Sequence, residues 1–131
     1  MLALIYHPIY SQLALPDGHR YPIQKYQRLY QAIQSHYSDE FLEAFKQIVE
    51  MAINHHQPDL IIYDAGVDIH FDDELGYLNI STEGLYQRDK FMRNITAQKG
   101  IPIACVVGGG YRNNHEDLVE PHLQLIRAFV N

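Results

Sequence analysis

Three short runs of apolar residues alternate along the chain with longer segments in which apolar residues recur at helical spacing. The runs cover residues 2–6, 60–63 and 101–107, and each has the length of a strand. Continuously apolar strands are typical of a parallel sheet that is buried on both faces. The pattern therefore predicts a single α/β domain over residues 1–131, with three layers: a mainly parallel sheet and helices on both of its faces.

Two helices are predicted between the first and second strands. Pro22 suits the first turn of a helix over residues 22–35, and Ser38 is a typical N-cap for a second helix that ends before Pro58. The apolar stripe of the first helix is formed by Tyr26, Leu29, Tyr30 and Ile33, and that of the second by Phe41, Leu42, Phe45, Ile48, Val49, Ala52 and Ile53. The two helices would meet between Ile33 and Asp39 without an intervening strand, whereas a strand separates every later helix from the next.

Two more helices follow the second and third strands. Ser81, Thr82 and Glu83 are typical of a helix start, and Gly100 is expected to end this helix after Lys99. The last helix is expected to begin at a capping box of Asn113 and Glu116. Its buried face would contain Leu118, His122, Leu125, Ile126 and Phe129. The predicted order of elements is therefore β-α-α-β-α-β-α.

Charge and composition exclude several classes of partner. The formal net charge is -6 and the 10 Lys and Arg residues are scattered, which argues against nucleic acid and against an acidic membrane surface. No apolar run has the length of a membrane span, and residues 1–5 lack the basic start of a signal peptide, so we expect a cytoplasmic protein. The single cysteine, Cys105, lies in an apolar run and is expected to be a core residue.

The candidate chemistry follows the second and third strands. Asp64, Asp68 and His70 come directly after residues 60–63, with Asp72 and Asp73 close behind, and these side chains suit either a divalent metal or a solvated acidic loop. The third strand is followed by a turn of three glycines and a tyrosine, residues 108–111, which should lie on the same edge of the sheet. This turn lacks the spacing of a dinucleotide-binding or P-loop motif.

The motifs resemble a known family. The stretch Tyr63-Asp64-Ala65-Gly66-Val67-Asp68-Ile69-His70, then Asp72-Asp73-Glu74-Leu75-Gly76 and Gly108-Gly109-Gly110-Tyr111, is similar to the zinc-dependent histone deacetylase and acetoin-utilisation proteins of the arginase-deacetylase fold. Tyr6-His7-Pro8-Ile9-Tyr10-Ser11 and His19-Arg20-Tyr21-Pro22 resemble the amino-terminal block of their bacterial, class IV-like members. The two blocks, residues 1–34 and 37–131, cover almost the whole chain.

The resemblance implies zinc-dependent hydrolysis of acetyl-lysine-type amides. It assigns Asp68 to a zinc ligand and Tyr111 to the hydroxyl that stabilises the oxyanion. His19, Arg20 and the glycines Gly109 and Gly110 would border the substrate channel. By the same resemblance, His70 matches the motif but is not a ligand.

The departures from the family pattern concern its catalytic centre. The family's adjacent His-His pair and its Asp-x-His motif, which supplies two further zinc ligands, are absent, and the gap falls at the join between residues 34 and 37. His55 and His56 belong to the helix before the matched strand, so they do not replace the pair. We therefore expect a truncated deacetylase-family domain that is inactive as an isolated chain.

Two alternatives remain beside this interpretation. The first is a non-catalytic remnant whose exposed sheet edge is covered by self-association or by a partner chain. The second is a receiver-like signalling domain, suggested by the run from Pro58 to Asp64. The receiver interpretation is weakened because the first strand ends in Tyr6 and His7, where an acidic pair would be needed.

Overall fold

The structure is a computed structural model that describes residues 24–130. The predicted strand over residues 2–6 and the loop with His19 and Arg20 lie outside the described residues. The described elements are α1 (Lys25–His56), β1 (Ile61–Asp64), α2 (Thr82–Lys99), β2 (Ile103–Val106), the 3₁₀ helix η2 (His115–Leu118) and α3 (Val119–Val130). None of these helices is both long and apolar enough to cross a membrane.

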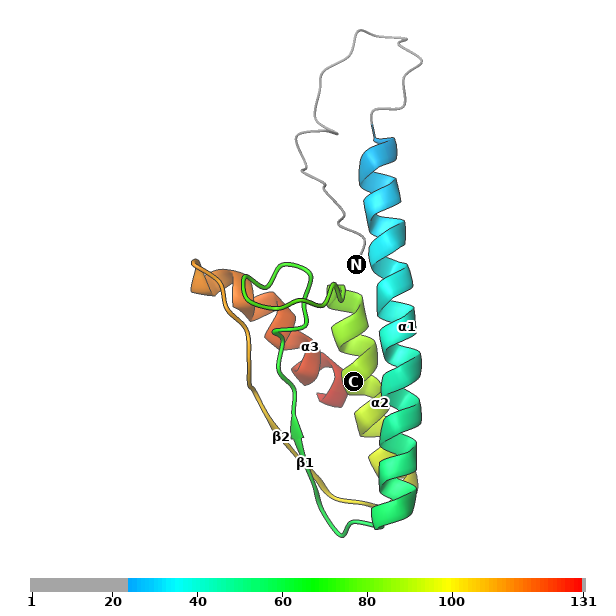
Figure 1. The fold of residues 1–131 in the computed structure, drawn as a ribbon. Helices are drawn as coiled ribbons and strands as arrows, with labels where there is room; N and C mark the ends of the chain where they lie inside the picture. Colours follow the sequence, from blue (N-terminus) through cyan, green and yellow to red (C-terminus); the bar gives the residue numbers. More distant parts are fainter. Residues whose placement is uncertain (1–23, 131) are drawn as a thin grey trace, which may run out of the picture.

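The centre of the fold is a β1–α2–β2 unit. The two strands pair in parallel, with Ile61 opposite Ile103 and Asp64 opposite Val106, and α2 makes the crossover between them. In Figure 1 both strands run upward while all three α-helices run downward beside them. Two of the predicted strands and the alternation of strand and helix are therefore confirmed, and the carboxyl ends of both strands lie at the same edge.

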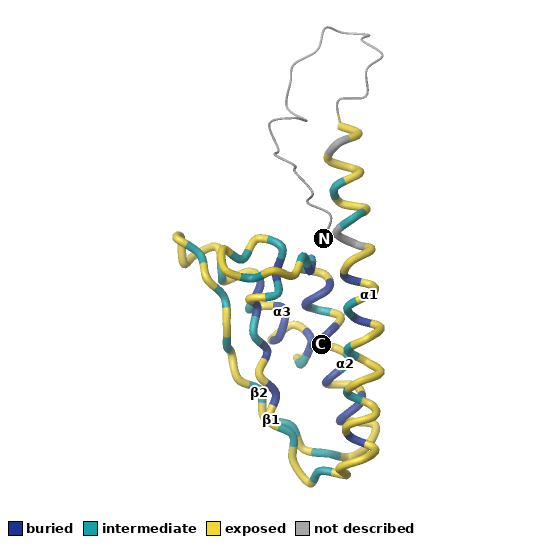
Figure 2. Tube along the Cα trace, in the orientation of Figure 1, coloured by how far each residue is buried: buried dark blue, intermediate teal, exposed yellow. Residues whose placement is uncertain are grey.

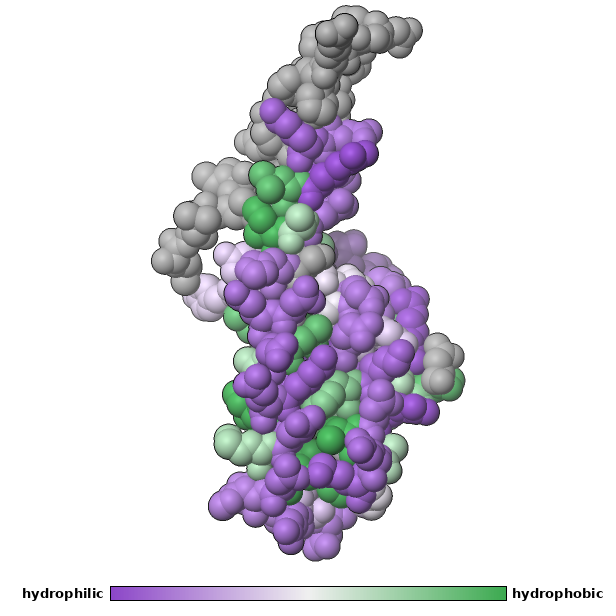
Figure 3. Space-filling view, turned by 90° about the vertical axis from the view of Figure 1, so that its right-hand side faces the viewer, coloured by the Kyte–Doolittle hydropathy of each residue, from purple (hydrophilic) through white to green (hydrophobic). Residues whose placement is uncertain are grey.

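A single helix replaces the two helices predicted between residues 22 and 58. α1 runs without interruption from Lys25 to His56, so the predicted join and the N-cap at Ser38 are both wrong. The physical reason is local, because no glycine or proline occurs in these 32 residues to stop the helix. The outer face of α1 is mostly hydrophilic, as expected for a helix that packs along one side only (Figure 3).

Ser38 is instead a buried contact between α1 and the start of α2, with 4% of its surface exposed. Its Oγ accepts a hydrogen bond of 3.0 Å from the backbone N–H of Ser81 and lies 3.1 Å from the Ser81 hydroxyl. The helices approach so closely that a Cβ added at Gly84 would lie 3.0 Å from the Ser38 Oγ, and it would also lie 2.7 Å from Ile80, just before α2. The Ser38 hydroxyl therefore does not cap a helix of its own but binds Ser81, the residue that caps the start of α2.

The predicted ends of α2 are confirmed by their hydrogen bonds. The Ser81 side chain accepts from the backbone N–H of Gly84, and Gly100 ends the helix in the left-handed conformation at a φ of 66°. The start of the last helix is shifted by one residue from the prediction. Asn114, and not Asn113, accepts the N–H of Glu116, and the segment begins as η2 before continuing as α3.

The hydrophobic core lies between the sheet and the three helices. Its largest cluster joins Tyr63 and Ala65 to Met92 of α2 and Leu125 of α3, with Phe45 of α1 packed against it. Burial alternates along both strands (Figure 2), and Ile62, on the opposite face of the sheet, is 74% exposed. Within residues 24–130 the helices therefore cover one face of the sheet, whereas the sequence pattern predicted cover on both.

The loop after β1 is fastened to α2 through His70, which is 6% exposed. Its Nε2 lies 2.9 Å from the Thr82 hydroxyl, and its Nδ1 accepts a bond of 3.3 Å from the backbone N–H of Asp72. An Nδ1 that accepts is unprotonated, so this arrangement requires the neutral imidazole. Burial accordingly lowers the pKa of His70, and this outweighs the opposite effect of the Asp72 carboxylate.

Because His70 is buried in its neutral form, we expect the stability of the protein to decrease below neutral pH. Because the folded state resists protonation of His70 while the unfolded chain does not, the unfolded state binds more protons, and the free energy of unfolding falls as the pH drops below the ordinary value of 6.5. Urea unfolding between pH 8 and pH 5 measures the effect. H70Q should show a weaker dependence on pH, whereas H115Q, at an exposed histidine, should behave as the original chain. Equal pH dependence in H70Q and the original chain would contradict this role.

Candidate functional site

Two loops are held together beyond the carboxyl ends of β1 and β2. The parallel ladder continues past the strands, because the N–H of Ala65 donates to the Val106 carbonyl at 3.0 Å and that of Val67 to the Gly108 carbonyl at 3.2 Å. The segment that carries Asp64 and Asp68 therefore runs directly beside the glycine turn. The prediction that these two motifs share one edge of the sheet is confirmed.

The carboxylates of Asp64 and Asp68 lie directly against the glycine turn. A Cβ built at Gly108 would be 2.2 Å from an Asp64 oxygen, and one at Gly109 would be 2.8 Å from the Asp68 carboxyl group. Gly109 and Gly110 also have positive φ angles, of 58° and 106°. A side chain at Gly109 would therefore meet the Asp68 carboxylate and strain the backbone, and one at Gly110 would strain the backbone and meet Val67. The glycines allow two acidic groups and a turn of backbone to occupy one small region.

Asp73 joins the two loops through three backbone N–H groups. Its Oδ1 accepts bonds from Leu75 at 2.9 Å and Gly76 at 2.7 Å, and its Oδ2 accepts one of 2.6 Å from Tyr111. Partial burial opposes ionisation, but these donors and the nearby Arg112 hold the pKa of Asp73 below its usual range. The ionised carboxylate thereby fixes the backbone of Tyr111, whose side chain is half exposed.

Further contacts on either side of Asp73 strengthen the same junction. The guanidinium of Arg112 donates to the carbonyl oxygen of Asp72 at 2.7 Å and to its carboxylate at 3.1 Å. The N–H of Asn113 donates to Glu74, and the N–H of Glu74 donates to the Tyr111 carbonyl. The carboxylates of the acidic loop therefore mainly bind the segment after β2 and hold it in place.

The metal hypothesis based on this loop finds no complete site. Among residues 24–130, no three His, Cys, Asp or Glu side chains form a group that could hold a metal ion. His70 is committed to Thr82 and the backbone, and Asp73 to three N–H groups. A catalytic zinc needs three protein ligands and an open position, so the described residues do not fit one.

Arg88 and Asp89 of α2 stabilise the loop after β1, and no sequence motif indicated a role for either residue. Arg88 is 5% exposed, donates from Nη1 to the Gly66 carbonyl at 2.7 Å, and pairs with the Asp89 carboxylate. That carboxylate also accepts a bond of 2.6 Å from the hydroxyl of Tyr63, and burial raises the pKa of Tyr63. The signal was present in the sequence, because Arg88 and Asp89 occupy core positions in the stripe between Leu85 and Met92.

The remaining candidates lie elsewhere or outside the described residues. His55 and His56 are the last residues of α1. They lie near the amino-terminal end of β1, whereas Asp68 follows its carboxyl end (Figure 1). Cys105 packs against the main core cluster, as predicted, and burial raises the pKa of its thiol. His19 and Arg20 lie outside the described part of the chain.

Comparison with known proteins places the chain in a family. Residues 21–125 match the histone deacetylase domain. An uncharacterized protein of Picosynechococcus is 42% identical over 90 residues, which are 69% of this chain and 30% of that protein. Histone deacetylase 2 of Arabidopsis thaliana is 33% identical over 87 residues, or 66% of this chain and 22% of the relative.

The acetoin utilization protein AcuC of Staphylococcus aureus is 36% identical over 72 residues, which are 54% of this chain and 18% of that protein. The chain thus matches less than a third of the length of each of these relatives. The domain match extends over most of the chain and includes both loops at the carboxyl ends of the strands. The chain therefore belongs to the histone deacetylase family.

Proposed function

We propose that the chain carries one part of a deacetylase centre and has no appreciable deacetylase activity by itself. In this proposal Asp68 occupies a zinc-ligand position and Tyr111 supplies the hydroxyl that stabilises the oxyanion, while Gly109, Gly110, His19 and Arg20 border the channel for an acetylated amine or lysine. The contact between the Asp68 carboxylate and the turn that leads to Tyr111 is the observation that supports it best.

The missing parts of the centre explain the proposed inactivity. Hydrolysis of an amide in this family uses zinc, which acts as a Lewis acid and activates water. One matched carboxylate would hold zinc weakly, because no three possible ligand side chains form a group among residues 24–130. The sequence also has no counterpart of the family's catalytic His-His pair, which would supply the base. We place the lost central segment between residues 34 and 37, within α1. The helix continues smoothly through this point, so a deletion here would leave no break in the backbone hydrogen bonding.

A second candidate function is binding to another chain in the cytoplasm. Parallel sheets are normally covered on both faces, but the face of β1 and β2 away from the helices exposes Ile62 and Val106, next to Leu60 and Val107. Each strand also has an unpaired outer edge within residues 24–130. A second copy or a partner strand would cover both features, and in a full deacetylase fold further strands would do so.

If the centre is incomplete, the chain should bind zinc only weakly. The chelator-treated chain, reloaded with zinc and passed through gel filtration, should retain no tightly bound metal and should not hydrolyse an acetyl-lysine peptide. D68A should then behave as the original chain, as should D39A, a control at an exposed acidic residue of α1. Tight binding of one zinc that D68A abolishes and D39A preserves would overturn the proposal of an incomplete centre.

The position of Tyr111 should depend on Asp73. In D73N an N–H group of the amide would face one of the backbone donors, so at least one of three strong hydrogen bonds is lost. We expect the amide hydrogen of Tyr111 to exchange roughly tenfold faster in D73N, as measured by NMR. D72N is the matched control, since Asp72 contacts Arg112 and not the Tyr111 backbone. Equal exchange of the Tyr111 amide in D73N and D72N would refute the assignment.

The exposed face of the sheet should mediate self-association. Sedimentation velocity at increasing concentration should show dimers or larger species, and I62K should weaken this association about tenfold by placing a charge in the interface. I48K introduces the same charge at a side chain of α1 with 60% exposure and should leave association unchanged. A chain that stays monomeric at high concentration would count against self-association.

A further inference from the structure

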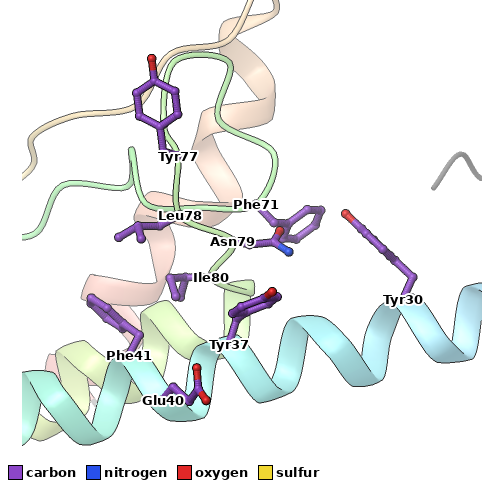
Figure 4. Close-up of a pocket in the computed structure, with 10 residues that line it drawn as sticks. Tyr30, Tyr37, Glu40, Phe41, Phe71, Tyr77, Leu78, Asn79 and Ile80 are labelled. Carbon is purple, nitrogen blue, oxygen red and sulfur yellow. The ribbon is translucent and has the colours of Figure 1, made fainter. Parts of the chain in front are cut away.

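A cavity of about 740 Å³ lies between α1 and the segment of residues 71–80. One wall is formed by Tyr30, Tyr37 and Phe41 of α1, and the other by Phe71, Asn79 and Ile80 (Figure 4). This volume suits a small organic ligand, because such sites typically have several hundred cubic ångströms and mostly apolar linings. The described residues assigned above to the deacetylase centre, Asp68, Gly109, Gly110 and Tyr111, do not line this cavity.

Aromatic rings dominate the lining. Figure 4 shows Tyr30 and Tyr37 leaning from α1 toward Phe71 of the opposite wall, while Tyr77 points away from them. Phe41 lies deeper, next to Ile80, and it is held by stacking on Phe45 with ring centroids 5.8 Å apart. The ring faces of such residues carry partial negative charge, which attracts cations that shed part of their water.

The electrostatics of the cavity favour a positive ligand. Among the described residues that line it, Glu40 is the one charged side chain, and these residues include no Lys or Arg. Within the described part of the chain, the one salt-bridge partner of the Glu40 carboxylate is the exposed imidazole of His36 at 3.3 Å, which carries a charge only when it is protonated. The whole chain carries a formal charge of -6. An anion would therefore meet repulsion here, and a neutral apolar ligand would gain nothing from Glu40.

We propose that this aromatic cavity binds a small organic cation, such as a quaternary or substituted ammonium group. The alkyl groups of the ligand would contact Tyr37, Phe41 and Phe71, and Glu40 would provide the long-range attraction. This inference does not depend on zinc or on deacetylase activity. It also requires no rearrangement of the chain, because both walls belong to elements already fastened to each other through Ser38 and Ser81.

The test compares choline with its neutral isostere 3,3-dimethyl-1-butanol on the full chain. In NMR titrations, choline should shift the backbone amide signals of Tyr37, Leu78 and Asn79, and 3,3-dimethyl-1-butanol should bind at least about tenfold more weakly. The amide signal of Gln98, near the far end of α2, should not move with either compound. Equal affinity for the two compounds would overturn the proposal, as would choline shifts that avoid the cavity.

Variants on α1 separate the roles of charge and ring. E40Q should weaken choline binding several-fold and leave binding of the neutral compound unchanged, whereas E43Q, on the same helix but outside the cavity, should change neither. Y37L keeps an apolar side chain at a partly exposed position and should reduce the preference for choline over the alcohol. Choline binding that survives both E40Q and Y37L at full strength would refute the assignment to this cavity.

Discussion

The parallel pairing of β1 with β2 is the constraint on which the rest of the structure depends. The crossover through α2 forces the two strands to end at one edge, and the ladder bonds from Ala65 and Val67 extend the pairing into the loops. Once the loops run side by side, a Cβ at Gly108 or Gly109 would collide with the Asp64 or Asp68 carboxylate unless that carboxylate moved. The site is therefore a consequence of strand register, and a slip of one residue would separate its two halves.

The buried pair of Arg88 and Asp89 shows what this pairing requires from the core. An arginine that is almost fully buried is stable only if its donors and its charge are satisfied, and here the Gly66 carbonyl and Asp89 provide most of that compensation. Removing one partner of such a pair typically costs about 3 to 5 kcal/mol, because the other charge is left buried. The hydroxyl of Tyr63 completes the network from β1, so strand, crossover helix and turn are fixed by one set of contacts.

Features set by local chemistry could be predicted from the sequence, and features set by distant partners could not. Ser81 and Gly100 end α2 as predicted because capping depends on neighbouring residues. Ser38 has the same chemistry, but its partner is Ser81, 43 positions away, and nothing nearby interrupts α1. Likewise Asp72 and Asp73 are adjacent residues of the same type, so the sequence does not distinguish them. Only the approach of residues 111–112 gives them different partners.

Within residues 24–130, the open face of the sheet and the incomplete deacetylase centre that we propose would have one physical cause. In α/β folds the groups of a site come from the ends of several neighbouring strands, and two strands bring only two loops to the edge. Each strand added beside β1 or β2 would contribute another loop to that edge, and the helix of its crossover could cover the face on which Ile62 is now exposed. Under the proposal of an incomplete centre, completing the sheet and completing the site would therefore be the same structural requirement. The described part of the chain holds the two loops in place because Asp73 and Arg88 stabilise them without help from further strands.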